Sequence, residues 1–327
     1  MAYSSGSTIL DDDYNIFATG NAAGSGDDTV ANINTVWGSG TGDKGYGQTS
    51  TVAAVSAGAV ITATQWATLL TRMTSIANHQ GTTITGISNP NAGDTIEAYA
   101  ALSSNITAIF NARNDAAANG SDDTTNGTTQ TSSTWDVRAV TTKTITFSST
   151  DTLRYFFNAG GMIRMAWSLT GGSDAKSIEW ADLLSQSGTI VATGAAASKT
   201  IAAVAYTGTT KIGGSGTPDT LATGTGVNDY TGTPVTIFKQ FADTAPYTAN
   251  YIQVNASISG AVITYAVTLE DAATDTIAPD GSGSGDALDV VDGTLTMTTV
   301  IRPPSTTYIS TTWGTPTQNA ATWTLTS

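Results

Sequence analysis

The side chains able to carry chemistry are few in this chain, and their types limit the reactions open to it. There is one histidine, His79, and no cysteine among 327 residues. Disulfides, thiolate catalysis and cysteine-ligated zinc are therefore excluded. A multi-histidine metal site is excluded within one chain, although a cluster of His79 side chains between subunits stays open. We expect His79 in the last turn of a helix, where the helix dipole favours it.

A glycine-rich stretch over residues 38–47 resembles a phosphate-binding loop in composition. Gly40, Gly42 and Gly45 fit the spacing G-x-G-x-x-G. That fingerprint needs a strand before it and a helix after it, whereas here a helix-like segment precedes and a Thr/Val run follows. A P-loop does not fit either, because Lys44 is followed by glycine rather than by Ser or Thr. We therefore expect a structural turn.

The acidic segment over residues 270–292 holds the candidate metal ligands Asp280, Asp286 and Asp289. Calcium prefers carboxylate and carbonyl oxygens from flexible loops, but the EF-hand spacing is absent. The sequence therefore predicts a solvated acidic turn and no cofactor, with bound calcium as the alternative.

A carboxylate pair for glycoside hydrolysis would have to come from few residues. The glutamates are Glu97, Glu179 and Glu270, and we expect Glu97 in a helix cap. Glu179 stands beside Trp180, which is typical either of a sugar-binding pair or of ordinary packing. We predict that the chain is not an enzyme, and a polysaccharide depolymerase that uses Glu179 is the alternative.

Composition and charge argue against nucleic acid and anionic membranes as partners. Only 12% of residues are charged and the net charge is −14, so Lys/Arg clusters for nucleic acid or an anionic membrane surface are missing. The N-terminus has no basic and apolar signal-peptide pattern, and no apolar run approaches the ~20 residues that span a bilayer. We expect synthesis in a bacterial host cytoplasm without secretion by a signal peptide.

Residues 1–118 are expected to form a helical module. Capping patterns and apolar stripes predict helices over 62–80 and 94–119, and a shorter one over 28–37. Three short helices make a small core, so we expect an oligomeric interface, with a trimer favoured. The candidate interface residues are Trp66, Leu69, Leu70, Met73, Ile106 and Phe110 of the helices, and Trp323 near the C-terminus.

Residues 119–134 contain nothing apolar and are expected to be a polar linker to a β domain over 135–327. There the hydrophobic period switches to two, which predicts an antiparallel β-sandwich and an α+β, mainly β fold class. A strand at 323–325 completes its own sheet or pairs with a neighbour's edge. The other expected strands cover 144–147, 153–157, 162–169, 200–205, 234–241, 251–258, 262–269 and 295–301, with a short helix over 178–184.

Three segments carry a likeness to a known family: Ile33–Gln48, Ile61–Trp66 and Asn78–Gly81. Together they resemble a module of virion structural proteins of tailed bacteriophages, especially marine cyanophages. The resemblance covers the helical part of the chain and carries over no functional residues.

That resemblance implies a structural component of a virion, such as a fibre, collar or tail appendage subunit. Its expected partners are further copies of itself and other virion proteins. Three alternatives stay open: a capsid decoration protein, a carbohydrate-binding adhesin for a host surface glycan, and a cellular filament or surface-layer protein.

Overall fold

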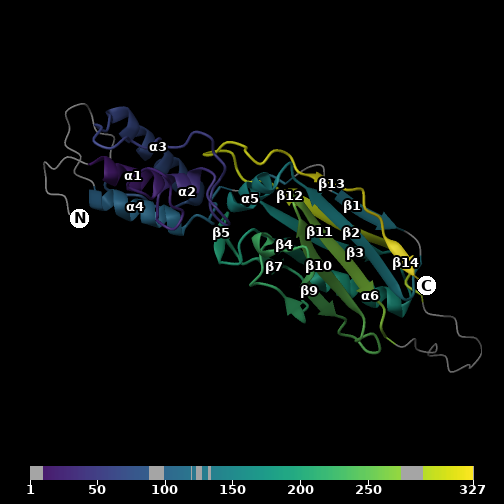
Figure 1. Ribbon diagram of the computed structural model, residues 1–327. Coiled ribbons are helices and arrows are strands. Elements are labelled where there is room, and N and C mark those ends of the chain that lie inside the picture. The colour runs from purple at the N-terminus through teal and green to yellow at the C-terminus, as the bar shows by residue number, and fades with distance from the viewer. Residues whose placement is uncertain are drawn as a thin grey trace, which may run out of the picture.

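The computed structural model describes residues 10–87, 99–118, 120–122, 127–131, 134–273 and 290–326. A group of helices and a β-sandwich lie end to end, which makes the molecule elongated (Figure 1). The expected fold class is confirmed, since helices come first and antiparallel strands dominate the rest. Asp280, Asp286 and Asp289, the candidate calcium ligands, lie outside the described residues, as does Glu97.

The helical module contains α1 (Asp11–Thr19), α2 (Ile33–Trp37), α3 (Ala63–Gln80) and α4 (Tyr99–Asn111). As predicted, α3 begins with a capping box between Thr62 and Gln65, and ends at Gly81 with a φ of 76°. The helix expected over 28–37 is only the short α2. Helix α1 was not predicted; its first turn is the acidic run at residues 11–13, which suits the positive end of a helix dipole.

The predicted interface residues of the helices are covered within one chain. Five of them, Trp66, Leu69, Leu70, Met73 and Ile106, are at most 5% exposed. Helix α2 packs on both α3 and α4, and α1 packs on α2, so the apolar stripes meet one another. The expectation that a second copy is needed to cover these side chains therefore does not hold. Phe110 is half-buried against the same core.

The β domain consists of two antiparallel sheets. The first has the strand order β1-β12-β3-β4-β7, and the second has the order β13-β2-β11-β10-β9-β8, with β14 also paired to β2. A separate hairpin joins β5 to β6. The first sheet contains β1 (Gly127–Thr131), β3 (Met162–Thr170), β4 (Thr189–Ala192), β7 (Thr209–Ile212) and β12 (Thr294–Arg302). The second contains β2 (Arg138–Thr146), β8 (Thr220–Leu221), β9 (Val235–Phe241), β10 (Tyr251–Ser259), β11 (Val262–Glu270), β13 (Thr317–Gln318) and β14 (Thr324–Thr326).

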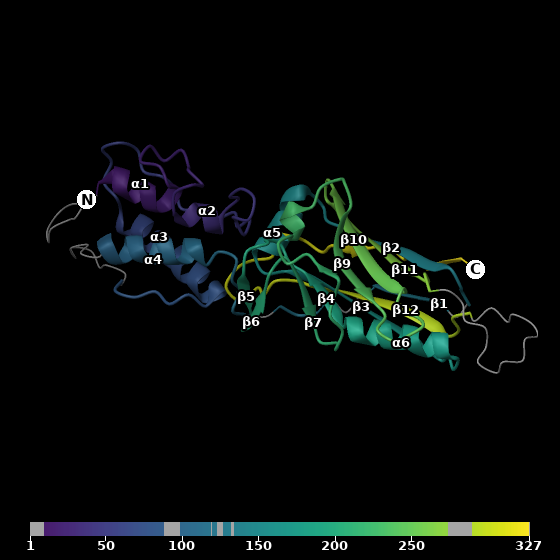
Figure 2. The ribbon, with the colours of Figure 1, turned by 90° about the horizontal axis from the view of Figure 1, so that it is seen from below.

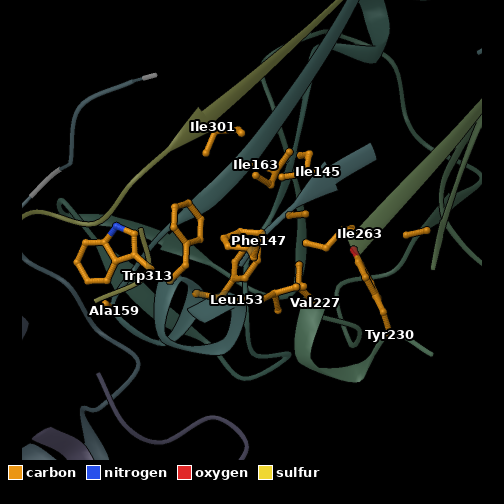
Figure 3. Close-up of a cluster of buried hydrophobic side chains, with 14 of the residues drawn as sticks. Ile145, Phe147, Leu153, Ala159, Ile163, Val227, Tyr230, Ile263, Ile301 and Trp313 are labelled. Atoms are coloured by element: carbon orange, nitrogen blue, oxygen red, sulfur yellow. The ribbon is translucent and has the colours of Figure 1, made fainter. Parts of the chain in front are cut away.

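Alternating side chains of the long strands fill the space between the sheets, as the period of two predicted. Trp167 of β3 stacks on Phe238 of β9 with ring centroids 6.3 Å apart. At the end of the sandwich nearest the helices, Phe147 and Leu153 lie between Trp313 and Val227 (Figure 3). The buried side chains of the helices and of the sandwich form one continuous cluster.

Two helices flank the sheets, and one of them corrects the sequence prediction. The segment 153–157, expected to be a strand, belongs to α5 (Thr150–Asn158). Its apolar residues Leu153, Phe156 and Phe157 have helical spacing, and Ser149 and Thr152 form a capping box. Helix α6 (Ala175–Ser187) confirms the short helix expected there and packs mainly on β3.

Two further segments differ from expectation. Part of the predicted linker forms β1, because Gly127–Thr131 pairs along its whole length with β12. The strand expected over 200–205 is instead the hairpin of β5 (Lys199–Ile201) and β6 (Val204–Tyr206), which turns at Ala202 and Ala203 with positive φ angles. Both views place α5 and β5 at the end of the sandwich that faces the helices (Figures 1 and 2).

Candidate functional site

The glycine-rich loop is the joint between the helical module and the sandwich. The Asn158 side-chain amide, at the end of α5, donates to the carbonyl oxygens of Gly42 at 3.1 Å, Lys44 at 2.9 Å and Gly45 at 3.2 Å. Arg154 of the same helix donates from Nη1 to the carbonyl of Lys44 at 2.8 Å. Backbone oxygens of the loop thus face a cation and an amide. A phosphate cradle presents N–H groups instead, so this loop face does not resemble one.

Glycine is required at two places in this joint. Gly45 has a φ of +89°, and a Cβ there would lie 2.3 Å from the carbonyl oxygen of Ser39. Gly47 has a φ of +70°, and its Cβ would lie 2.3 Å from the ring of Tyr155 on α5. Both positions combine a left-handed backbone with close contact, which only glycine tolerates. Close packing therefore explains glycines in this loop, whose spacing resembles a nucleotide-binding motif.

His79 belongs to the same joint. It lies in the last turn of α3, as predicted, but it is fully buried, and its Nε2 donates to the carbonyl oxygen of Ala159 at 2.9 Å. The ring of Tyr46 meets it edge-on with centroids 5.1 Å apart. Burial lowers the pKa of His79 to about 4. The imidazole is therefore neutral near pH 7, so attraction of a charged ring to the helix dipole does not explain its position.

The segment after β12 returns to the joint from the far end of the chain. The Gln48 side chain donates to the carbonyl of Ser310 at 2.8 Å and accepts from its N–H at 2.9 Å. Thr312 Oγ1 donates to the carbonyl of Tyr46 at 2.8 Å. Residues far apart in sequence therefore hold the loop from two sides.

A pocket of about 530 Å³ opens beside these contacts. Its wall includes Trp37, with the Arg72 guanidinium 5.0 Å from the ring centroid, and Tyr308, whose side chain is exposed. Arg72 Nε also donates to the carbonyl of Ser50 at 3.0 Å. The pocket thus combines the exposed ring of Tyr308, a cation and hydroxyl groups, which is a lining that suits a polyhydroxyl ligand.

One group of carboxylates in the described residues could hold a cation. Oxygens of Glu179, Asp182 and Asp243 lie within 4.8 Å of one another. Gln186 Nε2 donates to Asp182 at 2.8 Å and to Asp243 at 3.1 Å, so an amide already bridges two of the three. Trp180 is 1% exposed and therefore presents no ring to a sugar. Its place beside Glu179 reflects ordinary packing.

A second charged group, which the sequence did not predict, is largely buried. Lys176 of α6 is 1% exposed and forms ion pairs with Asp136 and Asp271. The three residues are widely separated in sequence and carry no recognisable motif, so only a structure could bring them together.

The predicted C-terminal residue Trp323 lies inside its own chain. It is 7% exposed, and the neighbouring β14 pairs with β2 of the same sheet. Nearby, Asn319 accepts from the N–H of Thr144 at 2.8 Å, so the segment between β13 and β14 is also held along β2. The terminal segment completes its own sheet in this structure.

Comparisons with protein-family models, with curated proteins and with solved structures found no match for this chain. Among the residues that the structure describes, no helix has the length and apolar character needed to cross a membrane.

Proposed function

We propose that this chain is a non-enzymatic structural subunit of a tailed-bacteriophage virion, in a fibre, collar or tail appendage. The helical module attaches the subunit to its neighbours and the sandwich is presented outward. The observation that carries the proposal is the joint, which fixes the direction of the sandwich relative to the helices. The resemblance of segments in the helical module to virion proteins supplies the setting.

The joint is built for rigidity rather than for bending. Besides the loop, the chain that leaves α4 pairs with β5: the N–H of Ala116 donates to Thr200 at 2.8 Å and the N–H of Ala202 to Ala116 at 2.9 Å. The loop contacts of α5 and the bonds to Ser310 act at other points of the same end. Contacts from several separate segments restrain the two parts of the chain against each other, which a subunit that projects a surface at a fixed distance needs.

Exposed apolar side chains favour self-association, and two of them lie at the end of the helical module away from the sandwich. Val60 is 85% exposed and Leu10 is 52% exposed. The N–H of Gly58 donates to Asp11 Oδ2 at 3.0 Å, which keeps the two segments together. We propose that copies of the chain, a trimer being favoured, meet at this end.

The virion role is tested on particles purified from the phage that carries the gene. We expect mass spectrometry to find the chain in gradient-purified particles at a fixed copy number, and antibodies to the sandwich to label one structure in electron micrographs. A chain that is abundant in the lysate but absent from washed particles would contradict the proposal. Light scattering of the purified chain tests self-association, which a well-behaved monomer at micromolar concentration would overturn.

A second candidate function, glycan binding, is favoured by the pocket beside the joint. Tyr308 is 41% exposed there and offers a ring face for stacking. On a glycan array we expect binding by the unaltered chain and its loss in Tyr308→Ala. Phe241→Ala serves as the matched control, because Phe241 is 37% exposed and lines a different pocket. Absence of binding to any host-type glycan would remove this candidate.

A further inference from the structure

The buried group around Lys176 joins two parts of the sandwich. Lys176 Nζ lies 2.7 Å from Asp136 Oδ1 and 2.5 Å from Asp271 Oδ2. Asp136 precedes β2 and Asp271 follows β11, and these strands pair with each other, so the two carboxyl groups meet at one end of the second sheet. The lysine comes from α6, which packs mainly on the first sheet. A link at this point therefore ties the two layers together.

The surroundings of this group are apolar and closed. The side chains of Lys176 and Asp271 are each 1% exposed, and that of Asp136 is 13% exposed. Trp135, next to Asp136, and Trp180, one turn after Lys176, meet edge to face with ring centroids 4.9 Å apart. Separated charges are costly in such a place, which favours return of a proton from the ammonium to a carboxylate. The neutral amine that results is the nucleophile of amide formation, and the protonated acid beside it is a proton donor for the same reaction.

We propose that Lys176 and Asp136 condense into an intramolecular amide bond, with Asp271 as the proton-transfer group. Nζ lies 2.7 Å from Oδ1 of Asp136, so the lysine nitrogen and the carboxyl group that it would attack are held in direct contact. Asp136 is the acceptor of the new bond because it is the more exposed of the two acids, which gives the departing water a way out. Asp271, which is enclosed and closest to Nζ, keeps the proton inside the site.

The atoms of the reaction balance without any further reagent. Nζ gives one proton to Asp271, and the neutral amine attacks the Asp136 carboxyl carbon, whose oxygen accepts that proton. That protonated oxygen is now a hydroxyl group, and a second proton passes to it from the nitrogen through Asp271. The hydroxyl group then leaves as water, and the new C–N bond remains. Asp271 ends as it began, and the net change is the loss of one water molecule.

Such a bond would be a covalent cross-link that stabilises the fold, as a disulfide does in other proteins. The chain has no cysteine. A cross-link from α6 to the start of β2 closes a loop of the unfolded chain and reduces its conformational freedom. It would also hold the two sheets together under pulling forces.

The test is the intact mass of the full-length purified chain under denaturing conditions. We expect a mass lower than that of the sequence by one water, about 18 Da, and a branched peptide after digestion that contains Lys176 and Asp136. Lys176→Arg keeps the positive charge but cannot condense, and Asp271→Asn removes the proton-transfer group, so both should have the full sequence mass. Lys143→Arg is the matched control, because Lys143 is also 1% exposed yet donates to the carbonyl of Asn319. It should retain the water loss.

Three outcomes would overturn the proposal. The first is a full sequence mass in unaltered protein whose circular dichroism shows it to be folded, which would mean an ion pair only. The second is a water loss that maps to a cyclic imide at one aspartate, with no branched peptide. The third is a water loss that persists in Lys176→Arg. Because the bond forms only in the folded chain, circular dichroism must first show that Asp271→Asn is folded, and its mass is then read under the same denaturing conditions.

Discussion

The Nε2 of His79 donates a hydrogen bond to the carbonyl oxygen of Ala159 across 2.9 Å, and this bond joins α3 of the helical module to the end of α5 in the sandwich. The carbonyl can only accept, so Nε2 carries the proton in the neutral ring. The two parts of the chain therefore share a buried polar contact as well as a continuous apolar core.

This contact makes stability depend on pH in a defined direction. The pKa of His79 falls from 6.5 to about 4 on folding because the ring is buried. Between these values the unfolded chain binds a proton that the folded chain does not, so stability falls as pH is lowered. We expect His79 to account for a loss of about 2 kcal/mol between about pH 7.5 and about pH 5. Urea unfolding of His79→Gln at both pH values should lack this loss, and an equal loss in both proteins would contradict the argument.

The two glycines Gly45 and Gly42 should differ sharply in their tolerance of alanine. At Gly45 the added Cβ would meet the Ser39 carbonyl at 2.3 Å, whereas at Gly42, with a φ of +55°, nothing lies within 4 Å. We expect Gly42→Ala to cost about 1 kcal/mol through backbone strain alone, and Gly45→Ala to cost about 3 kcal/mol or more. Chemical denaturation measures both. Equal costs would show that the close approach does not hold the joint.

Lys199 of β5 is a buried cation near the joint, and it should destabilise the fold at neutral pH. Burial lowers its pKa to about 8, against the opposing attraction of Asp43, Asp229 and Asp115. Between pH 8 and 10.5 the unfolded chain keeps a proton that the folded chain has released, so stability from this group rises with pH. The free energy of unfolding of Lys199→Met near pH 7 should therefore be higher by up to about 3 kcal/mol. It should also lack the increase between pH 8 and 10.5. A less stable variant near pH 7 would indicate that the aspartates need the lysine.

Trp323 tests whether the terminal strand belongs to its own sheet. We expect Trp323→Ala to lower the free energy of unfolding by about 3 kcal/mol, since a buried indole is removed, without changing the oligomeric state. Thr324→Ala, at the next residue, is the control, and should change stability by less than about 0.5 kcal/mol because Thr324 is exposed. Thermal unfolding and light scattering give the two readouts. Normal stability with loss of assembly would show instead that the strand is donated to a neighbour.

The sequence alone determined those elements whose signals are local. The capping box at Thr62 and the glycine at position 81 bound α3 because cap hydrogen bonds join residues three to five apart. The alternation over 251–258 and 262–269 predicted β10 and β11, since each strand is buried on one face. By contrast, the five residues at 153–157 were too short to separate a strand from α5 by period alone.

The tertiary structure decided everything that depends on strand order and on which segments meet. The apolar stripes of the helices proved to cover one another, because α2 lies against both α3 and α4, and no pattern within a helix reports its partner. The loop at 38–47 became a joint only when α5 and Ser310 were brought to it. Lys176, Asp136 and Asp271 converge because β2 pairs with β11 and α6 crosses their end. Such contacts join residues far apart in the chain, where hydrophobic period and capping carry no information.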